Sequence, residues 1–246
     1  MANQGRRPAK GTGRGTPVRR NKAAPAERFP PQKPKKKTAK VVFDAPAPEA
    51  DEPRTFRLGA VPGATPGKWI DAWKQRMPRV PLELVPIEVA TQRTALDEVD
   101  AALMRLPLVD ESLHIIALYD EVPVVIAAVD SHLMAAEELT AADLEGEVVI
   151  GLTDDVLGPL ELPGTVPAAF AALPTAEAVT TAASGVGVVI VPMSLARLHH
   201  RKDVGHRVLT EGPVSTVALV WPRERTTADV ETFVGIVRGR TANSSR

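Results

Sequence analysis

The sequence contains no cysteine among its 246 residues. This excludes disulfide bonds, zinc sites built from thiolates and a cysteine nucleophile. A serine in a nucleophile elbow, the HExxH pattern and the glycine-rich phosphate loop are missing as well. These absences predict that the chain is not an enzyme and that it carries no cofactor or metal ion.

Long apolar runs are also missing. The longest runs, PVVIAAV and VGVVIVP, have the length of a strand and are far too short to cross a membrane. The first thirty residues lack the continuous apolar core of a secretion signal. An apolar fraction of 44% is nevertheless ample for a core. We therefore expect a cytoplasmic protein that does not associate with a membrane.

The net charge of zero conceals a strong asymmetry along the chain. Residues 1–40 carry thirteen Lys or Arg against the single acid Glu27, which leaves 17 bases and 29 acids in the remainder. Residues 1–54 are rich in Pro, Gly, Ala and basic residues, so they cannot bury enough apolar surface to offset the entropy lost on ordering. We predict a disordered basic tail over residues 1–54.

Two functions fit such a tail. Flexible Lys and Arg side chains can displace counterions from phosphates and so bind DNA or RNA without reading sequence. Alternatively, the tail folds loosely over its own acidic domain and neutralises it. The residues that would carry nucleic-acid binding are Arg6, Arg7, Arg19, Arg20, Lys33, Lys35, Lys36 and Lys37.

The sequence after the tail alternates strand-like and helical patterns, which indicates an α/β domain. We expect strands at residues 55–61, 81–87, 99–106, 113–118, 122–129, 148–152, 186–191 and 215–222. We expect helices from residue 66 to 77, at 92–98, at 176–183 and at 226–237. Thr65 is placed to cap the first helix, with Pro66 at its first position. Trp69 and Trp73 follow at helical spacing, which favours core or dimer contacts over a stacking platform for a ligand.

Three segments resemble, in the same order, the effector-binding domain of LysR-type transcriptional regulators. They are VDAALMRLP at residues 99–107, LHIIALYDEVPVVIAAVDSHL followed by LTAADLEG within residues 113–146, and AASGVGVVIVPMSLARL at residues 182–198. The resemblance extends from about residue 55 to residue 240. It implies a two-lobed fold of the type II periplasmic-binding-protein class with a central cleft, preceded here by the disordered basic tail.

The resemblance also implies a domain division and a function. Lobe I would comprise residues 55–121 and 215–240, and lobe II residues 122–214. The domain would bind a small organic effector, for which we expect an anion, act as a sensor linked to transcription, and form a homodimer. The winged helix-turn-helix of that family needs more apolar periodicity than the first 54 residues contain, so we expect it to be missing. The alternative is a nucleic-acid-associated protein in which the folded domain serves only as an oligomerisation scaffold.

Effector contacts are expected where the carboxyl ends of the first three strands meet the facing lobe. The resemblance places them at the turn into the first helix, after the second strand, at the end of the third strand and near residue 153. The candidate residues are Thr65, Gly67, Lys68, Thr91, Gln92, Arg105 and Thr153. Arg105 could clamp a carboxylate, or it could form an ordinary ion pair with Asp110 or Glu111.

The region between residues 152 and 175 is short, rich in Pro and Gly and weakly periodic. LysR effector domains usually carry an additional strand and helix there, so lobe II is expected to be trimmed. His199, His200 and His206 lie close together in the sequence, but no pattern of acidic ligands accompanies them. We expect solvated positions at a helix end and no metal site.

Overall fold

The computed structural model describes residues 53–239. The predicted tail lies outside the described residues except for residues 53 and 54, and so do all eight of its named basic residues. The α/β prediction is confirmed, because the described part contains two main sheets and helices pack against each of them. Between residues 53 and 239, no helix is both long and apolar enough to cross a membrane.

The first sheet has five strands in the order β2-β1-β3-β11-β4. Strand β1 pairs in parallel with β2 and β3, whereas β11 pairs antiparallel with β3 and β4. The strand bounds are β1 Phe56–Ala60, β2 Leu82–Pro86, β3 Ala101–Arg105, β4 Leu113–Glu121 and β11 Ser215–Pro222. The expected strand–helix–strand–helix–strand order of the first lobe is thus confirmed.

Both faces of this sheet are covered, which explains why its central strands are continuously apolar. Along β3, Leu103 packs under the helices α1 (Gly67–Arg76) and α5 (Ala228–Val237), and Met104 packs on the opposite face. Trp73 stacks on Phe56 with ring centroids 4.5 Å apart, and its indole nitrogen donates to the Val80 carbonyl. Of the two roles predicted for this tryptophan, core contact and dimer contact, Trp73 has the first, because it is fully buried.

The second sheet has four strands in the order β6-β10-β5-β9. Their bounds are β5 Pro123–Ala128, β6 Glu138–Leu139, β9 Val189–Pro192 and β10 Val204–Leu209. The helices α3 (Thr175–Ala182) and α4 (Met193–Leu198) cover one face, on which Val124 and Ile126 lie. The short 3-10 turns η2 (His132–Ala135) and η3 (Ala142–Leu144) lie at the other face.

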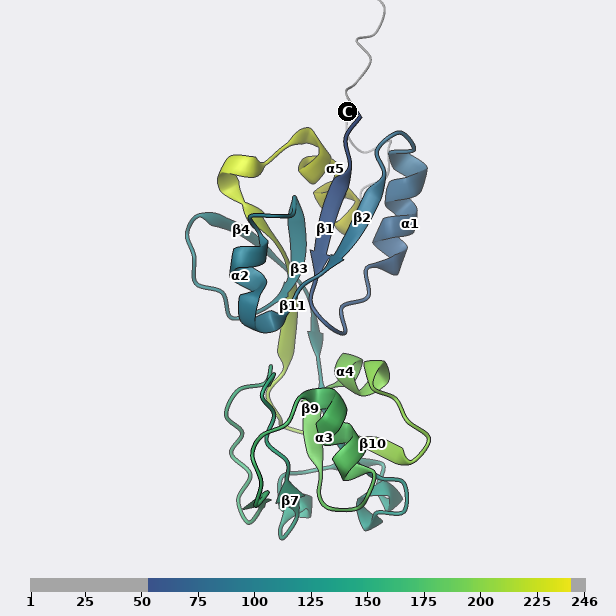
Figure 1. The fold of residues 1–246 in the computed structure, drawn as a ribbon, viewed down its shortest axis with the longest axis vertical. Coiled ribbons are helices and arrows are strands. Elements are labelled where there is room, and N and C mark those ends of the chain that lie inside the picture. The colour runs from purple at the N-terminus through teal and green to yellow at the C-terminus, as the bar shows by residue number, and fades with distance from the viewer. Residues whose placement is uncertain (1–52, 240–246) are drawn as a thin grey trace, which may run out of the picture. The chain divides into compact units, whose positions relative to one another are not determined.

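The chain passes twice between the sheets, as Figure 1 shows for β4 and β11. It leaves the first sheet at Val122, between β4 and β5, and returns through residues 210–214, between β10 and β11. We call the part built on the first sheet lobe I and the part built on the second sheet lobe II. This two-lobed α/β architecture confirms the predicted fold class.

Several predicted elements differ in the structure. The helix expected at residues 92–98 is a 3-10 turn, η1 (Val89–Thr91), followed by one turn of helix, α2 (Gln92–Ala95), because its polar sequence offers few buried contacts. The strand expected at 148–152 is shorter in the structure: β7 (Val148–Val149) pairs with β8 (Val166–Pro167). Val149 and Leu152 add only isolated bridges to Val188 and Leu173. His206 belongs to strand β10, not to a helix end, and burial is the main cause that lowers the pKa of its imidazole.

The start of α1 is also different from the prediction. Pro66 is the N-cap residue, the helix begins at Gly67, and no side chain caps it. The Thr65 capping role is therefore wrong. The sequence Thr-Pro-Gly is compatible with an N-cap at Thr65, one residue before the observed N-cap. In the structure the Pro66 carbonyl accepts from the backbone N–H groups of Trp69 and Ile70, so the helix begins after Pro66.

Candidate ligand-binding site

The three parallel strands of lobe I end at one edge of the sheet, at Ala60, Pro86 and Arg105. The segments after these ends face lobe II across a cavity of about 610 Å³, which we call the interlobe cavity. Lobe I contributes Pro62, Glu88, Val89, Ala90 and Arg105 to its lining. Lobe II contributes Thr153, Asp154, Asp155, Val156, Pro174, Ala176, Leu195, Leu198 and His199. The predicted cleft at the carboxyl ends of the strands is present.

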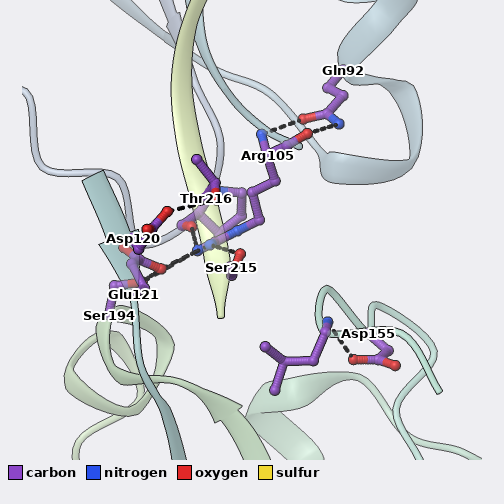
Figure 2. Close-up of polar contacts among 10 residues, drawn as sticks. Gln92, Arg105, Asp120, Glu121, Asp155, Ser194, Ser215 and Thr216 are labelled. Atoms are coloured by element: carbon purple, nitrogen blue, oxygen red, sulfur yellow. Dashed lines mark hydrogen bonds and ion pairs between the residues drawn. The ribbon is translucent and has the colours of Figure 1, made fainter. Parts of the chain in front are cut away.

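Arg105 lines this cavity, although only 2% of its surface is exposed. Figure 2 shows its side chain directed toward Glu121 and Ser215. Its Nη1 donates to the Glu121 carboxylate and to the Ser215 hydroxyl, both at 2.7 Å. Of the two alternatives for Arg105, the ion pair with Asp110 or Glu111 is wrong: Arg105 pairs with Glu121, and Asp110 pairs with Arg93. Burial makes the pairing with Glu121 necessary, since an unpaired charge in the interior is very costly.

Ser194 joins the two lobes through this ion pair. It is on α4 of lobe II, and its hydroxyl accepts from Arg105 Nη2 at 3.2 Å and donates to Glu121 at 2.8 Å. The same Nη2 donates to the Pro62 carbonyl at 3.2 Å. Gly63 packs directly against Ser194: a Cβ at residue 63 would lie 2.4 Å from the Ser194 hydroxyl oxygen.

Gln92 binds the backbone of Arg105 at the point where β1 no longer pairs with β3. Strand β1 pairs with β3 only as far as Leu103, after which the chain turns away at Pro62. The Gln92 side-chain amide then supplies the missing partners, donating to the Arg105 carbonyl at 2.9 Å and accepting from its N–H at 3.0 Å. This buried side chain is therefore fully engaged within the protein.

A second cavity of about 520 Å³ is also lined by residues from both lobes. Its lining residues are Gly63, Ala64, Thr65, Tyr119, Asp120, Glu121, Val122, Met193, Ser194, Arg197 and Leu198. The Tyr119 hydroxyl is buried beside the Thr65 backbone, which interacts with it weakly, and it has no partner at normal hydrogen-bond geometry within the described residues. Burial, together with the charge of Glu121, raises the pKa of this hydroxyl above its usual 10.0.

The structure distributes the predicted contact residues over several places. Arg105 and Thr153 line the interlobe cavity, and Thr65 lines the second cavity. Thr91 lines a separate hollow beside β2. Gly67 and Lys68 are exposed in the first turn of α1 and line neither cavity.

The residues that sequence reasoning missed are the partners of Arg105 and the acidic residues of the lining. Glu121 belongs to the Tyr-Asp-Glu segment, whose charge between two apolar strands could have been recognised as a buried ion in need of a partner. Ser194 and Ser215 carry no such signal, because they lie 89 and 110 residues from Arg105 in the sequence. Asp154 and Asp155 directly follow the predicted contact Thr153, but nothing in their local sequence indicates that they line a cavity.

Two α/β lobes joined by paired connections, with a cavity between them at the carboxyl ends of parallel strands, define a periplasmic-binding-protein-like fold of the kind found in effector-binding domains. The family model described as the LysR substrate binding domain matches residues 49–242. This chain therefore belongs to the LysR substrate-binding-domain family, as its sequence motifs suggest.

Known proteins support this assignment at the level of the fold. Over 210 residues the chain is 27% identical to the Hca operon transcriptional activator HcaR of Escherichia coli strain K12, an alignment that covers 78% of this chain and 70% of HcaR. It is similar to the BenM effector-binding domain with its effector benzoate, at a TM-score of 0.62 and 17% identity, covering 76% of this chain and 95% of that one. The oxidised form of OxyR matches with a TM-score of 0.60 and 21% identity, covering 78% of this chain and 98% of that one.

Three sequence-based expectations stay predictions, and only the first concerns residues outside the described range. Binding of DNA or RNA by the basic tail stays a prediction, as does the homodimer. The same is true of the individual effector contacts, because no ligand is present to define them.

Proposed function

We propose that this chain is a small-molecule sensor whose effector binds in the interlobe cavity and thereby acts on transcription. The observation that supports this most directly is the cavity itself, which has a volume of about 610 Å³ and is lined from both lobes. Cavities of this size typically hold one small organic molecule. In this proposal lobe I comprises residues 55–121 and 215–240, and lobe II comprises residues 122–214.

The polar contacts would come from the loop of lobe II that carries Thr153 and from the segment after β2 in lobe I. Arg105 would line the site without pairing with the ligand, because its two terminal nitrogens already bind groups of the protein. A ligand that contacts both lobes favours the closed arrangement in proportion to its difference in affinity for the closed and open states. The protein would bind its effector and leave it chemically unchanged.

A thermal unfolding screen of the full chain against small organic acids, amines and amino acids tests this proposal. A compound present at about 100 times its Kd should stabilise the protein by about 2.7 kcal/mol, which raises Tm by several degrees. NMR of the compound after incubation should show it unaltered. If no compound raises Tm, or if the compound is converted, the sensor proposal fails.

A blocked cavity provides the matched control. Ala176 is exposed on α3 and lines the interlobe cavity, so Ala176→Phe should fill the cavity and abolish the ligand-dependent increase in Tm. Ala228 is exposed at the start of α5 and does not line the cavity, so Ala228→Phe should keep the full increase. An equal increase in both variants would place the ligand elsewhere.

A further inference from the structure

More acidic than basic side chains line the interlobe cavity, and the acidic ones are more accessible to a ligand. Three carboxylates line it, namely Glu88 from lobe I and the adjacent Asp154 and Asp155 from lobe II. All three residues are exposed to solvent. The basic lining residues are Arg105 and His199. Of the two, the arginine is the side chain with a permanent positive charge.

Arg105 cannot act as a counterion for an incoming anion. Glu121 lies 2.7 Å from its Nη1, and the two side chains are 2% and 7% exposed. Both terminal nitrogens are used within the protein, and the remaining Nε is buried without a hydrogen-bond partner among residues 53–239. The positive charge of Arg105 is therefore neutralised by the protein before any ligand enters.

The positive end of a helix dipole at the cavity is also neutralised by a group of the protein. The first turn of α3 opens onto the cavity at Pro174 and Ala176, and the positive end of a helix normally attracts an anion. Here Asp154 already occupies that position: its Oδ1 accepts from the Thr175 N–H at 2.9 Å and from the Thr175 hydroxyl at 2.8 Å. A ligand carboxylate would have to approach next to this aspartate.

Carboxylate oxygens, in contrast, remain available to a ligand. Among residues 53–239, Asp154 and Asp155 each use only Oδ1 in a hydrogen bond, the latter as acceptor from the Leu157 N–H at 2.9 Å. Within the described residues, the Glu88 carboxylate takes part in no hydrogen bond or ion pair. The lining thus offers uncompensated acceptors from both lobes, which suit an N–H donor with positive charge.

We propose that the effector carries a protonated amine, held between Glu88 of lobe I and Asp154 and Asp155 of lobe II. This inference deepens the proposed sensor function and rests on it. It differs from the anionic effector expected from the sequence. Because the carboxylates come from both lobes, a cation between them would also reduce their mutual repulsion, so that charge neutralisation itself favours closure.

Three compounds with the same four-carbon chain test the charge of the ligand. Putrescine carries two ammonium groups, 4-aminobutyrate one ammonium and one carboxylate, and succinate two carboxylates. Thermal unfolding and calorimetric titration of the full chain above neutral pH should show binding of putrescine and none of succinate. Stabilisation by succinate without stabilisation by putrescine would overturn the charge assignment and leave the sensor proposal intact.

Matched variants separate the cavity from general attraction to an acidic protein. Glu88→Gln and Asp155→Asn each remove one charge and should weaken putrescine binding roughly twofold to fivefold, as expected when one exposed charge pair is lost. Glu231 is exposed on α5 and does not line the cavity, so Glu231→Gln should leave the affinity unchanged. Equal affinities in all three variants would overturn the proposal, as would the absence of binding by every amine tested.

Failure of the two proposals can be told apart. If an uncharged or anionic compound raises Tm and Ala176→Phe abolishes that increase, the cavity is a ligand site and only the charge assignment is wrong. If no compound of any charge raises Tm, both proposals are wrong.

Discussion

Gln92 and Arg105 are joined by a pair of hydrogen bonds in which a side-chain amide replaces a strand neighbour. Gln92 is one of the residues expected to contact the effector, yet both polar atoms of its amide bind the backbone of Arg105. The pair holds the end of β3 at the point where β1 has turned away. Its consequence for the site is indirect: Gln92 keeps Arg105 in place.

Removing this amide should reduce stability. In Gln92→Leu the Arg105 N–H and carbonyl would be buried without partners, and we expect a loss of about 1–3 kcal/mol in the free energy of unfolding. Urea unfolding measures the loss. Thr91→Ala, at the exposed neighbouring position, should change the free energy of unfolding little. Unchanged stability in Gln92→Leu would contradict the structural role and return Gln92 to the list of possible ligand contacts.

Breaking the buried ion pair should be more costly still. Glu121→Gln leaves Arg105 charged and uncompensated in the interior, for which we expect a loss of about 3–5 kcal/mol. The double variant Arg105→Met/Glu121→Leu removes both charges and should recover part of that loss. As a control, Asp203→Asn breaks an exposed pair with Arg201 and should have a small effect, because solvent screens that pair. Equal effects of Glu121→Gln and Asp203→Asn would show that burial of the pair is unimportant.

Gly63 should not tolerate a side chain. Its φ is +83°, a conformation that costs L-residues about 1–2 kcal/mol, and an added Cβ would also meet the Ser194 hydroxyl. Gly63→Ala should therefore lower the free energy of unfolding by more than that range. Gly67→Ala adds a Cβ with no heavy atom within 4 Å and should be neutral or slightly stabilising. Chemical denaturation compares the two variants, and similar values would refute the close contact between the lobes at Gly63.

Tyr119 should be replaceable by Phe without loss of stability. Its hydroxyl is buried and, within the described residues, has only a weak interaction with the Thr65 backbone, so removing it relieves a poorly satisfied polar group. We expect Tyr119→Phe to be neutral or to stabilise by up to about 1 kcal/mol, as measured by denaturant unfolding. A clear loss would mean that the hydroxyl has a partner, such as a bound water molecule in the second cavity.

Asp110 should stay ionised in acid. Its pKa is lowered to about 2, chiefly by the hydrogen bond from the Ser112 hydroxyl and next by that from the Ser112 N–H, with a smaller effect of Arg93. Because the folded-state pKa lies below the unfolded value of about 3.9, the stabilisation from Asp110 is present above that value and is lost as pH falls through about 2.

Ser112→Ala should raise the pKa of Asp110 toward its usual range, and Arg93→Ala should raise it less. The carboxyl carbon chemical shift at about pH 4, where an ordinary aspartate is half protonated, distinguishes the variants. Wild-type Asp110 should remain ionised there, and Ser112→Ala should be partly protonated. The reverse order of the two variants would assign the lowered pKa mainly to the ion pair.

Much of the fold follows from patterns that are local in the sequence. The strand at residues 215–222 has the predicted bounds, and α5 lies within the predicted 226–237, because apolar period and flanking polar residues determine both. Short elements such as β6, β8 and β10 were not predicted, since two to six residues of mixed polarity carry no clear period. Their pairing depends on neighbours that are distant in the sequence.

The sequence by itself determined the α/β class, the order of the long strands, the burial of Trp73 and the family to which the chain belongs. Only the tertiary structure decided what Arg105 does, because its partners Glu121, Ser194 and Ser215 lie 16, 89 and 110 residues away and meet it through chain crossings between the lobes. It also brought Glu88 and Asp155 to the same cavity. Local periodicity specifies which face of an element is buried, whereas the partners of a buried charge and the charge of a cavity depend on which distant segments the fold places together.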